Sequence, residues 1–356
     1  MKRKIFLLLL ILAAIETRAS AQDLSNGYLT VVAVGDIMMG STGFRTILPP
    51  NDGEDLFKEI GPLLEGGDII FGNLEGPLLD EGESTKCREE KSRFCFEFKM
   101  PTRYGRYLQQ AGFNALNVAN NHTWDFGIEG LKKTLEILES LGIQPIGGKA
   151  VARMEIKGKR VALVGFSYLP SSFAYSILDI EKAREIIGDL KKDHHLVIVS
   201  FHGGAEGRNA VEVPNETEIF LNENRGNVRL FSRSVIDAGA DLVLGHGPHV
   251  LRALELYKGK IIAYSLGNFL TYGMFNLKGP NGISAILKIN LDLETGNFLE
   301  GKLIPVRLLN GGIPEYDPVK EGVGIVKQLI ENSRFNFNIH LNEEGRLNRI
   351  PGLGDL

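Results

Sequence analysis

The sequence predicts a layered α/β fold, a sandwich in which two mixed sheets lie between helices. Short apolar runs alternate with helical segments, two pairs of strands flank tight turns, and polar residues directly follow the apolar runs. Alternating strands and helices are typical of parallel sheets, whereas hairpins add antiparallel strands. A chain that carries both patterns therefore favours mixed sheets.

Five apolar runs are candidates for strands buried on both faces. Each is rich in aliphatic and β-branched residues and leads into a small residue and then Asp, Asn, Glu or His. They lie at 31–36, 69–75, 115–122, 196–202 and 242–249. Strands of an open α/β sheet present their ligand-binding residues at their carboxyl ends, so these five ends predict one polar site.

The remaining elements follow from local spacing. Helical periodicity predicts helices at 55–64, 102–111, 128–141, 180–190 and 228–238. Turns at 157–160 and 257–260 predict hairpins between 154–156 and 161–166 and between 253–256 and 261–266. Strands are expected near 284–293 and 298–308, and the charged segment 79–99 is expected to be a loop over the mouth of the site.

Residues 1–21 have the pattern of a secretory signal peptide. Basic residues 2–4 precede an apolar stretch at 5–15, and Ala19-Ser20-Ala21 forms a small-residue cleavage site. We therefore expect an exported protein, in the periplasm, at the cell surface or outside the cell, with no transmembrane span in the mature chain. An uncleaved interfacial anchor is the alternative. Residues 22–356 are expected to form one domain, with a core at about 29–310 and a C-terminal extension.

Charge and cysteine content restrict the partners. Cleavage after Ala21 leaves 36 basic and 43 acidic residues, a net charge of about −7, which argues against a nucleic-acid partner. An acidic polymer would need a local basic or metal site. The two cysteines, Cys87 and Cys95, favour a local disulfide in an exported protein, with two free thiols as the alternative.

The strand ends carry groups that bind transition metals. Four of the seven histidines, His122, His202, His246 and His249, lie there together with Asp and Asn. Asp and Asn after a strand are also ordinary turn formers. Imidazoles beside carboxylate and amide oxygens nevertheless favour a site for one or two divalent ions of manganese, iron or zinc rather than calcium.

These residues carry a resemblance to a known family. The segments 34–38, 72–77, 119–127, 202–206, 245–250 and 264–269 resemble the signatures of the bacterial CapA family, which is linked to poly-γ-glutamate capsule synthesis. That family belongs to the calcineurin-like metallophosphatase superfamily. The resemblance spans roughly residues 29–270 and implies the layered fold of that superfamily, with capsule synthesis or export machinery as a partner.

The resemblance assigns roles residue by residue. It implies His122 as the proton donor to a leaving group and a set of metal ligands: Asp36, Asn73, Glu75, Asn121, His202, His246 and His249. Two departures concern the ligands. Met38 occupies the position where the superfamily has a His. In the second motif, Asn73 and Glu75 are present instead of the Asp that bridges the metals in the superfamily. Gly247 also occupies a position where many relatives have another His.

Further residues near these motifs are candidates for substrate binding. Glu206 and Arg208 lie in a Gly-rich loop, where solvent-exposed charges are the alternative, and Asn268 lies in the last matching segment. Asp125 is expected to cap the following helix or to support His122.

Two functions are consistent with the sequence. The first is a metal-dependent hydrolase acting on a phosphoester or a γ-glutamyl amide, with His122 as the acid. The second is a non-catalytic accessory protein that binds an acidic polymer during its export.

Overall fold

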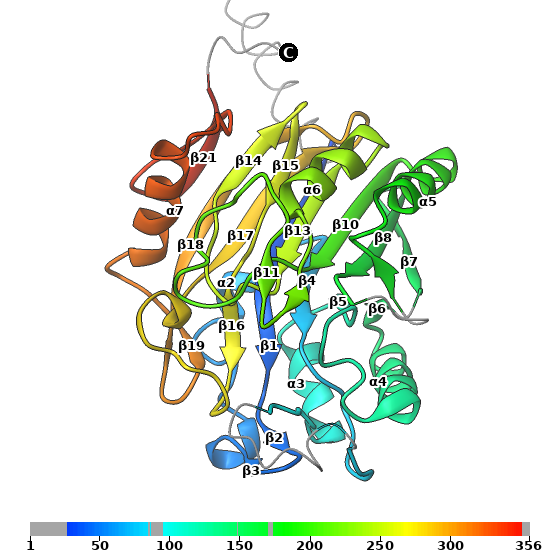
Figure 1. Ribbon diagram of the computed structural model, residues 1–356, viewed down its shortest axis with the longest axis vertical. Coiled ribbons are helices and arrows are strands. Elements are labelled where there is room, and N and C mark those ends of the chain that lie inside the picture. Colours follow the sequence, from blue (N-terminus) through cyan, green and yellow to red (C-terminus); the bar gives the residue numbers. More distant parts are fainter. Residues whose placement is uncertain (1–26, 85, 87–94, 148, 170–173, 351–356) are drawn as a thin grey trace, which may run out of the picture.

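The computed structural model describes residues 27–84, 86, 95–147, 149–169 and 174–350. Two large mixed sheets are stacked, with helices on both outer sides (Figure 1). This is the predicted layered α/β sandwich. The predicted signal peptide and Cys87 lie outside the described residues, among which no cysteine is free. No helix in the described part of the chain is both long and apolar enough to cross a membrane.

The first sheet has the strand order β20-β21-β18-β17-β1-β4-β5-β6, with β16 beside β1 and β19 beside β18. Strands β1, β4, β5, β6 and β16 are parallel, whereas β17 to β21 pair antiparallel. The bounds are β1 Tyr28–Met38, β4 Ile69–Leu74, β5 Ala115–Asn117, β6 Gln144–Ile146, β16 Asn268–Thr271, β17 Ile283–Asp292, β18 Phe298–Leu309, β19 Ile313–Tyr316, β20 Ile339–Leu341 and β21 Arg346–Arg349.

The second sheet has the order β14-β15-β13-β10-β8-β7, with β9 beside β8. Its central strands are parallel, and β7 and β14 pair antiparallel at its two edges. The bounds are β7 Val151–Ile156, β8 Lys159–Ser167, β9 Tyr175–Ser176, β10 Leu196–His202, β13 Leu242–His246, β14 Leu254–Tyr257 and β15 Lys260–Ala263. Two short ribbons complete the strands: β2 Ser41–Thr42 with β3 Thr46–Ile47, and β11 Ile219–Phe220 with β12 Glu223–Asn224.

Helices cover the outer faces of both sheets, except for α7 Glu321–Glu331, which contacts strands of both sheets at the edge of the sandwich. The others are α2 Gly61–Leu64, α3 Gly105–Gln110, α4 Gly127–Ser140, α5 Ile180–Asp193 and α6 Val228–Asp237, with 3₁₀ turns η1 Pro50–Gly53, η2 Thr102–Tyr104 and η3 Gly279–Gly282. The α3 and α4 helices share a core with the first sheet, and α5 and α6 lie against the second sheet (Figure 1).

Strand β1 shows why the apolar runs become central strands. Val31 and Ala33 belong to the core between the two sheets, whereas Val32 and Val34 belong to the core beneath α3 and α4. Because successive side chains of a strand point to opposite faces, only a continuous apolar run can serve both cores. The site residues then begin where the run stops, at Asp36.

The predicted hairpins are present. Both turns place Lys and Gly at positive φ, at Lys157-Gly158 and Lys258-Gly259, as two-residue hairpin loops require. The helix predicted at 55–64 is different: only Gly61–Leu64 is α-helical, and 53–60 form a chain of i to i+3 turns. Pro62 explains part of this difference, because it has no backbone N–H to donate and is therefore tolerated only in the first turn of an α-helix.

Candidate metal centre

The predicted site residues meet where the carboxyl ends of both sheets come together. The first sheet supplies Asp36 from β1, Asn73 from β4 and Glu75 just after it, and Asn121 with His122 from the turn after β5. The second sheet supplies His202 at the end of β10, His246 at the end of β13 and His249 three residues later. The centre therefore lies at the junction of the two sheets.

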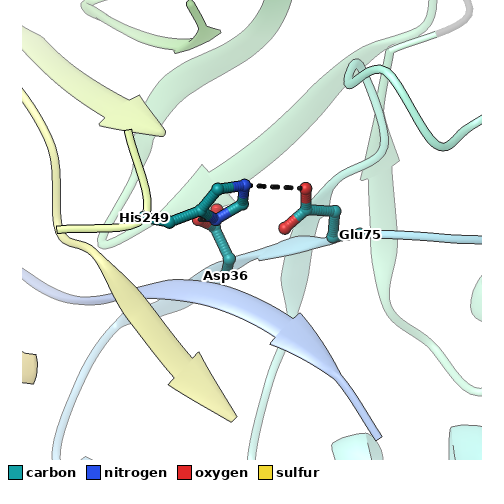
Figure 2. Close-up of side chains that lie close together, drawn as sticks. All are labelled: Asp36, Glu75 and His249. Atoms are coloured by element: carbon teal, nitrogen blue, oxygen red, sulfur yellow. Dashed lines mark ion pairs between the residues drawn. The ribbon is translucent and has the colours of Figure 1, made fainter. Parts of the chain in front are cut away.

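Asp36, Glu75 and His249 form its most compact part (Figure 2). One potential ligand atom from each lies within 4.8 Å of the others. His249 Nδ1 is 2.9 Å from Asp36 Oδ2, and His249 Nε2 is 3.5 Å from Glu75 Oε1. Both carboxylates have no exposed surface, and His249 is 7 % exposed. Two buried carboxylates so close together need either a proton on one of them or a positive charge beside them.

His202 and His246 lie beside this group. They occupy partner positions on the adjacent parallel strands β10 and β13. His246 Nδ1 is 3.4 Å from Asp36 Oδ1, and the His202 and His249 rings have centroids 6.4 Å apart. Imidazoles from the second sheet thus face carboxylates from the first sheet.

Several of these groups have buried polar atoms without a hydrogen-bond partner in the described part of the chain. They are both carboxylate oxygens of Glu75, Asn121 Oδ1, His202 Nε2 and both ring nitrogens of His246, while Asp36 Oδ2 has only its ion pair with His249. Leaving such an atom buried and unsatisfied costs about 1–3 kcal/mol. Their concentration in one place fits the donor set of a divalent transition metal, in which carboxylate and amide oxygens combine with imidazole nitrogens.

The pKa shifts of the buried carboxylates and of His249 are those expected of a site that can bind a cation. Burial lowers the pKa of His249, but Glu75 and Asp36 outweigh it and raise that pKa to about 10. Burial raises the pKa of Glu75 well above its usual value. Burial would also raise the pKa of Asp36, but His246 and His249 lower it. These directions favour protons on His249 and Glu75 in the metal-free protein, and metal binding would release them.

Asn73 is positioned differently from the ligand role that the resemblance implies. Its amide Nδ2 donates to Asp36 Oδ1 at 2.8 Å, and its Oδ1 accepts from Asn117 Nδ2 at 2.8 Å and Asn120 Nδ2 at 3.1 Å. Backbone contacts fix both donor amides, because Asn117 also donates to Ala119 O and Asn120 to Leu74 O. The Asn73 oxygen is therefore engaged, and this geometry favours Glu75 as the ligand from this segment.

His122 lies beside the centre with a carboxylate behind its ring. Asp125 Oδ2 is 2.7 Å from His122 Nδ1 and accepts the Phe98 N–H at 2.8 Å, and the Phe98 ring stacks on the imidazole at 4.0 Å. Burial lowers the pKa of His122, and the Lys86 charge lowers it further, although the Asp125 charge opposes both effects. The α4 helix has Phe126 at its N-cap and no side-chain cap bond, so Asp125 supports His122 rather than capping the helix.

The three predicted substrate-binding residues have different positions. Glu206 is partly buried and accepts Arg225 Nη1 at 2.6 Å. Arg208 is exposed and lines a separate cavity of about 630 Å³ beside the end of α7. Asn268 has no exposed surface, and its Oδ1 lies 3.1 Å from His249 Nδ1 while its Nδ2 donates to Asn281 O. This placement fits a residue that orients His249 better than a residue that contacts a substrate.

The departures from the superfamily pattern have structural counterparts. Met38 has no exposed surface, and its sulfur accepts the Gly40 N–H at 3.3 Å, so it is a core residue. Gly247 has φ +113, and a Cβ there would lie 2.9 Å from Gly203 O. A side chain at position 247 would therefore strain the backbone and overlap Gly203.

Sequence reasoning missed Asn117, Asn120 and Arg225 as residues that support the site, because no motif or spacing connects them to it.

Fold and site together define a two-sheet α/β protein with a buried carboxylate and imidazole cluster, a candidate metal centre, at the junction of its sheets. The family model described as bacterial capsule synthesis protein PGA_cap matches residues 30–272, and the chain belongs to that family. This confirms the family predicted from the motifs.

Two relatives from Bacillus align with most of the chain. It is 29 % identical to the capsule biosynthesis protein CapA of Bacillus anthracis, over 82 % of this chain and 72 % of that protein. It is 27 % identical to the PGA biosynthesis protein CapA of Bacillus subtilis, over 91 % of this chain and 82 % of that protein. A solved phosphatase from Mycoplasma pneumoniae aligns with a TM-score of 0.47 and 15 % identity, over 82 % of this chain and 96 % of that one.

Proposed function

We propose that this protein is an exported metal-dependent hydrolase of capsule polymer synthesis, acting on a phosphoester or a γ-glutamyl amide. The observation that carries the proposal is the group of buried, unsatisfied donor atoms beside the His122–Asp125 pair. Family membership supports the connection to capsule polymers, since the two Bacillus relatives are named for capsule and PGA biosynthesis. An acidic polymer or phosphoester is the proposed substrate, with the capsule synthesis or export machinery as partner.

The ligands would come from both sheets. Asp36, Glu75, Asn121, His202, His246 and His249 have the donor atoms to hold one or two ions of manganese, iron or zinc. A divalent ion in such a site supplies Lewis-acid polarisation of a phosphoryl or carbonyl oxygen and lowers the pKa of a coordinated water. Burial lowers the pKa of His202, which keeps its ring neutral and able to ligate.

The chain's own contribution to turnover centres on His122. Its Nδ1 is directed to Asp125, which leaves Nε2 as the atom that would carry a proton to the leaving group. Phe98 stacks on one face of the ring and fixes its orientation. The imidazole is therefore fixed in position beside the proposed ligands.

Metal analysis of purified protein, combined with a turnover screen over phosphoesters and γ-glutamyl peptides, tests the proposal. We expect stoichiometric transition metal and metal-dependent hydrolysis of one substrate class. His246→Ala should lose both, whereas Gly188→Ala, in a helix outside the site, should keep both. Metal-free protein that stays inactive when manganese, iron and zinc are added in turn would overturn it.

A non-catalytic accessory function is the second candidate. The observation that favours it is the replacement of two superfamily histidines by Met38 and Gly247, at positions where the fold has filled the space with core or backbone. Binding of polyglutamate by the wild-type protein without metal-dependent turnover of either substrate class would establish this reading and exclude the hydrolase.

A further inference from the structure

Glu206 is a carboxylate held at the edge of the centre. It follows β10 by four residues, and its Oε1 accepts Arg225 Nη1 at 2.6 Å. Its side chain is 19 % exposed, so it is neither a fully buried structural group nor a freely solvated one. A fixed carboxylate in this position can accept a hydrogen bond from a ligand at low entropic cost.

Arg225 connects Glu206 to the metal centre. Its side chain is 3 % exposed and lies over the Tyr168 ring at 4.0 Å, and Tyr168 in turn stacks beside His202 with ring centroids 6.2 Å apart. Its Nη2 contacts Glu223 Oε2 at 2.8 Å. The guanidinium is therefore locked between two carboxylates and an aromatic face, and it fixes the position of Glu206.

Glu206 is connected to the metal centre along the chain and through side-chain contacts. It follows His202, a proposed ligand, by four residues, and Arg225 and Tyr168 join it to the His202 ring. A ligand bound at the centre would therefore also experience this negative charge.

Among the described residues near the site, the cations Lys86 and Arg225 are already paired. Lys86 Nζ lies 2.5 Å from Asp125 Oδ1, and Arg225 contacts both Glu206 and Glu223. Sites that recognise phosphate groups use Arg or Lys side chains that are free to form charge-assisted bonds with the phosphate oxygens. Glu206 is paired with Arg225 through Oε1, but Arg225 is shared with Glu223, so these three residues keep a net negative charge, and the Glu206 side chain remains 19 % exposed. Such a group attracts an ammonium and repels a phosphate.

We propose that Glu206 binds the free ammonium group of an amine-bearing γ-glutamyl amide, and that Arg225 is its positioning residue. This inference rests on the proposed function and selects one of its two substrate classes. In the hydrolysis of such an amide, a water oxygen forms the new bond to the carbonyl carbon and the C–N bond breaks. The amine leaves with a proton from His122, and the other product is a carboxylate.

Binding of a free and a blocked amine tests the proposal without requiring turnover. The probes are a γ-linked glutamate tripeptide and its N-acetyl derivative, titrated calorimetrically into metal-loaded wild-type protein, Glu206→Gln and Glu212→Gln. Glu212 is an exposed carboxylate of the same loop, so its variant is the matched control. A hydrogen bond between charged groups predicts a preference for the free amine of about 10-fold to 100-fold in wild type and control. Glu206→Gln should abolish it.

Equal affinity of the wild-type protein for the two peptides would overturn the inference, and so would a preference that persists in Glu206→Gln. The wild-type comparison decides the point even if that variant does not fold. If the binding preference holds but neither substrate class is turned over, the hydrolase proposal fails and this inference stands. If phosphoesters are hydrolysed and the peptides bind without preference, the hydrolase proposal stands and this inference fails.

Discussion

At the scale of single residues, the centre depends on how Asp36 is held. An amide hydrogen of Asn73 and two imidazoles face it, and all of these groups are buried. Two further asparagines fix the orientation of that amide, because Asn117 and Asn120 both donate to the Asn73 oxygen. The carboxylate therefore stays charged in a buried position, where it can serve as a ligand.

Asn73→Asp should make stability more dependent on metal. In metal-free protein the new carboxylate would face Asp36 at the present 2.8 Å contact and cost about 3 kcal/mol or more, as unpaired buried charges do. A bound divalent ion would offset that cost by accepting a further carboxylate. Thermal melts with and without chelator measure the difference.

Asn114→Asp is the matched control, because the Asn114 amide donates to Asp68 O at 2.9 Å, a backbone acceptor far from the centre in the fold. It should destabilise the protein equally with and without metal. An Asn73→Asp protein whose metal-free melting temperature matches the wild type would contradict the hydrogen-bonding role of Asn73.

His122→Asn separates a catalytic from a structural imidazole. We expect turnover to fall by about 10²-fold to 10⁴-fold, the usual contribution of a positioned acid, with metal content and ligand binding retained. Steady-state kinetics and metal analysis on the same preparation check both parts. If activity falls only in proportion to the folded fraction, the role of His122 is structural. Asn121→Ala is the control, since it should release metal while His122 remains in place.

At the scale of elements, glycines allow the strands to bring the ligands together. A Cβ at Gly35 in β1 would lie 1.9 Å from Gly267 O, and one at Gly245 in β13 would lie 2.4 Å from Tyr264 O. Neither position has room for any side chain, so the backbone of each strand passes directly against its neighbour. The glycines before Asp36 and His246 are thus packing requirements directly next to proposed ligands.

Gly35→Ala should lower stability by about 3 kcal/mol or more and reduce metal content, because the overlap is with backbone that cannot move independently. Gly188→Ala in α5 is the control: its Cβ would meet nothing within 4 Å, and alanine should stabilise the helix by about 0.5–1 kcal/mol. Chemical denaturation of both variants measures the contrast. A stable, metal-replete Gly35→Ala protein would show that β1 and the loop at Gly267 can separate.

At the scale of the whole molecule, the centre joins the two sheets. Asp36, Glu75 and Asn121 come from the first sheet, and His202, His246 and His249 come from the second. A metal held by both sets would resist separation of the sheets. Because such an ion binds the folded chain and not the unfolded one, it stabilises the fold as a whole.

Metal removal should therefore lower the melting temperature. At a free metal concentration 100 times the Kd the stabilisation is about 2.7 kcal/mol, and it is lost after chelation. We also expect one tightly held ion and one weak or absent ion per chain, since Met38 replaces a ligand with a core side chain. Metal analysis after dialysis against chelator tests this stoichiometry, and two tightly retained ions per chain would contradict it.

Sequence by itself determined the layered class, the hairpins, the family and the position of donor residues at strand ends. These features are local: an apolar run, a Lys-Gly turn and a helical period are each set within about a dozen residues. The helix predicted at 55–64 was wrong over most of its length. A helical period in the sequence does not distinguish an α-helix from the series of turns that forms there.

Only the tertiary structure decided which donors remain free and which are engaged. The pairing of Glu206 with Arg225, the orientation of Asn73 by Asn117 and Asn120, and the addition of β20 and β21 to the first sheet all join residues distant in sequence. No periodicity encodes such contacts, because they depend on how two sheets and their loops pack. The sequence therefore located the donor residues, and packing distinguished candidate ligands from the residues that orient them.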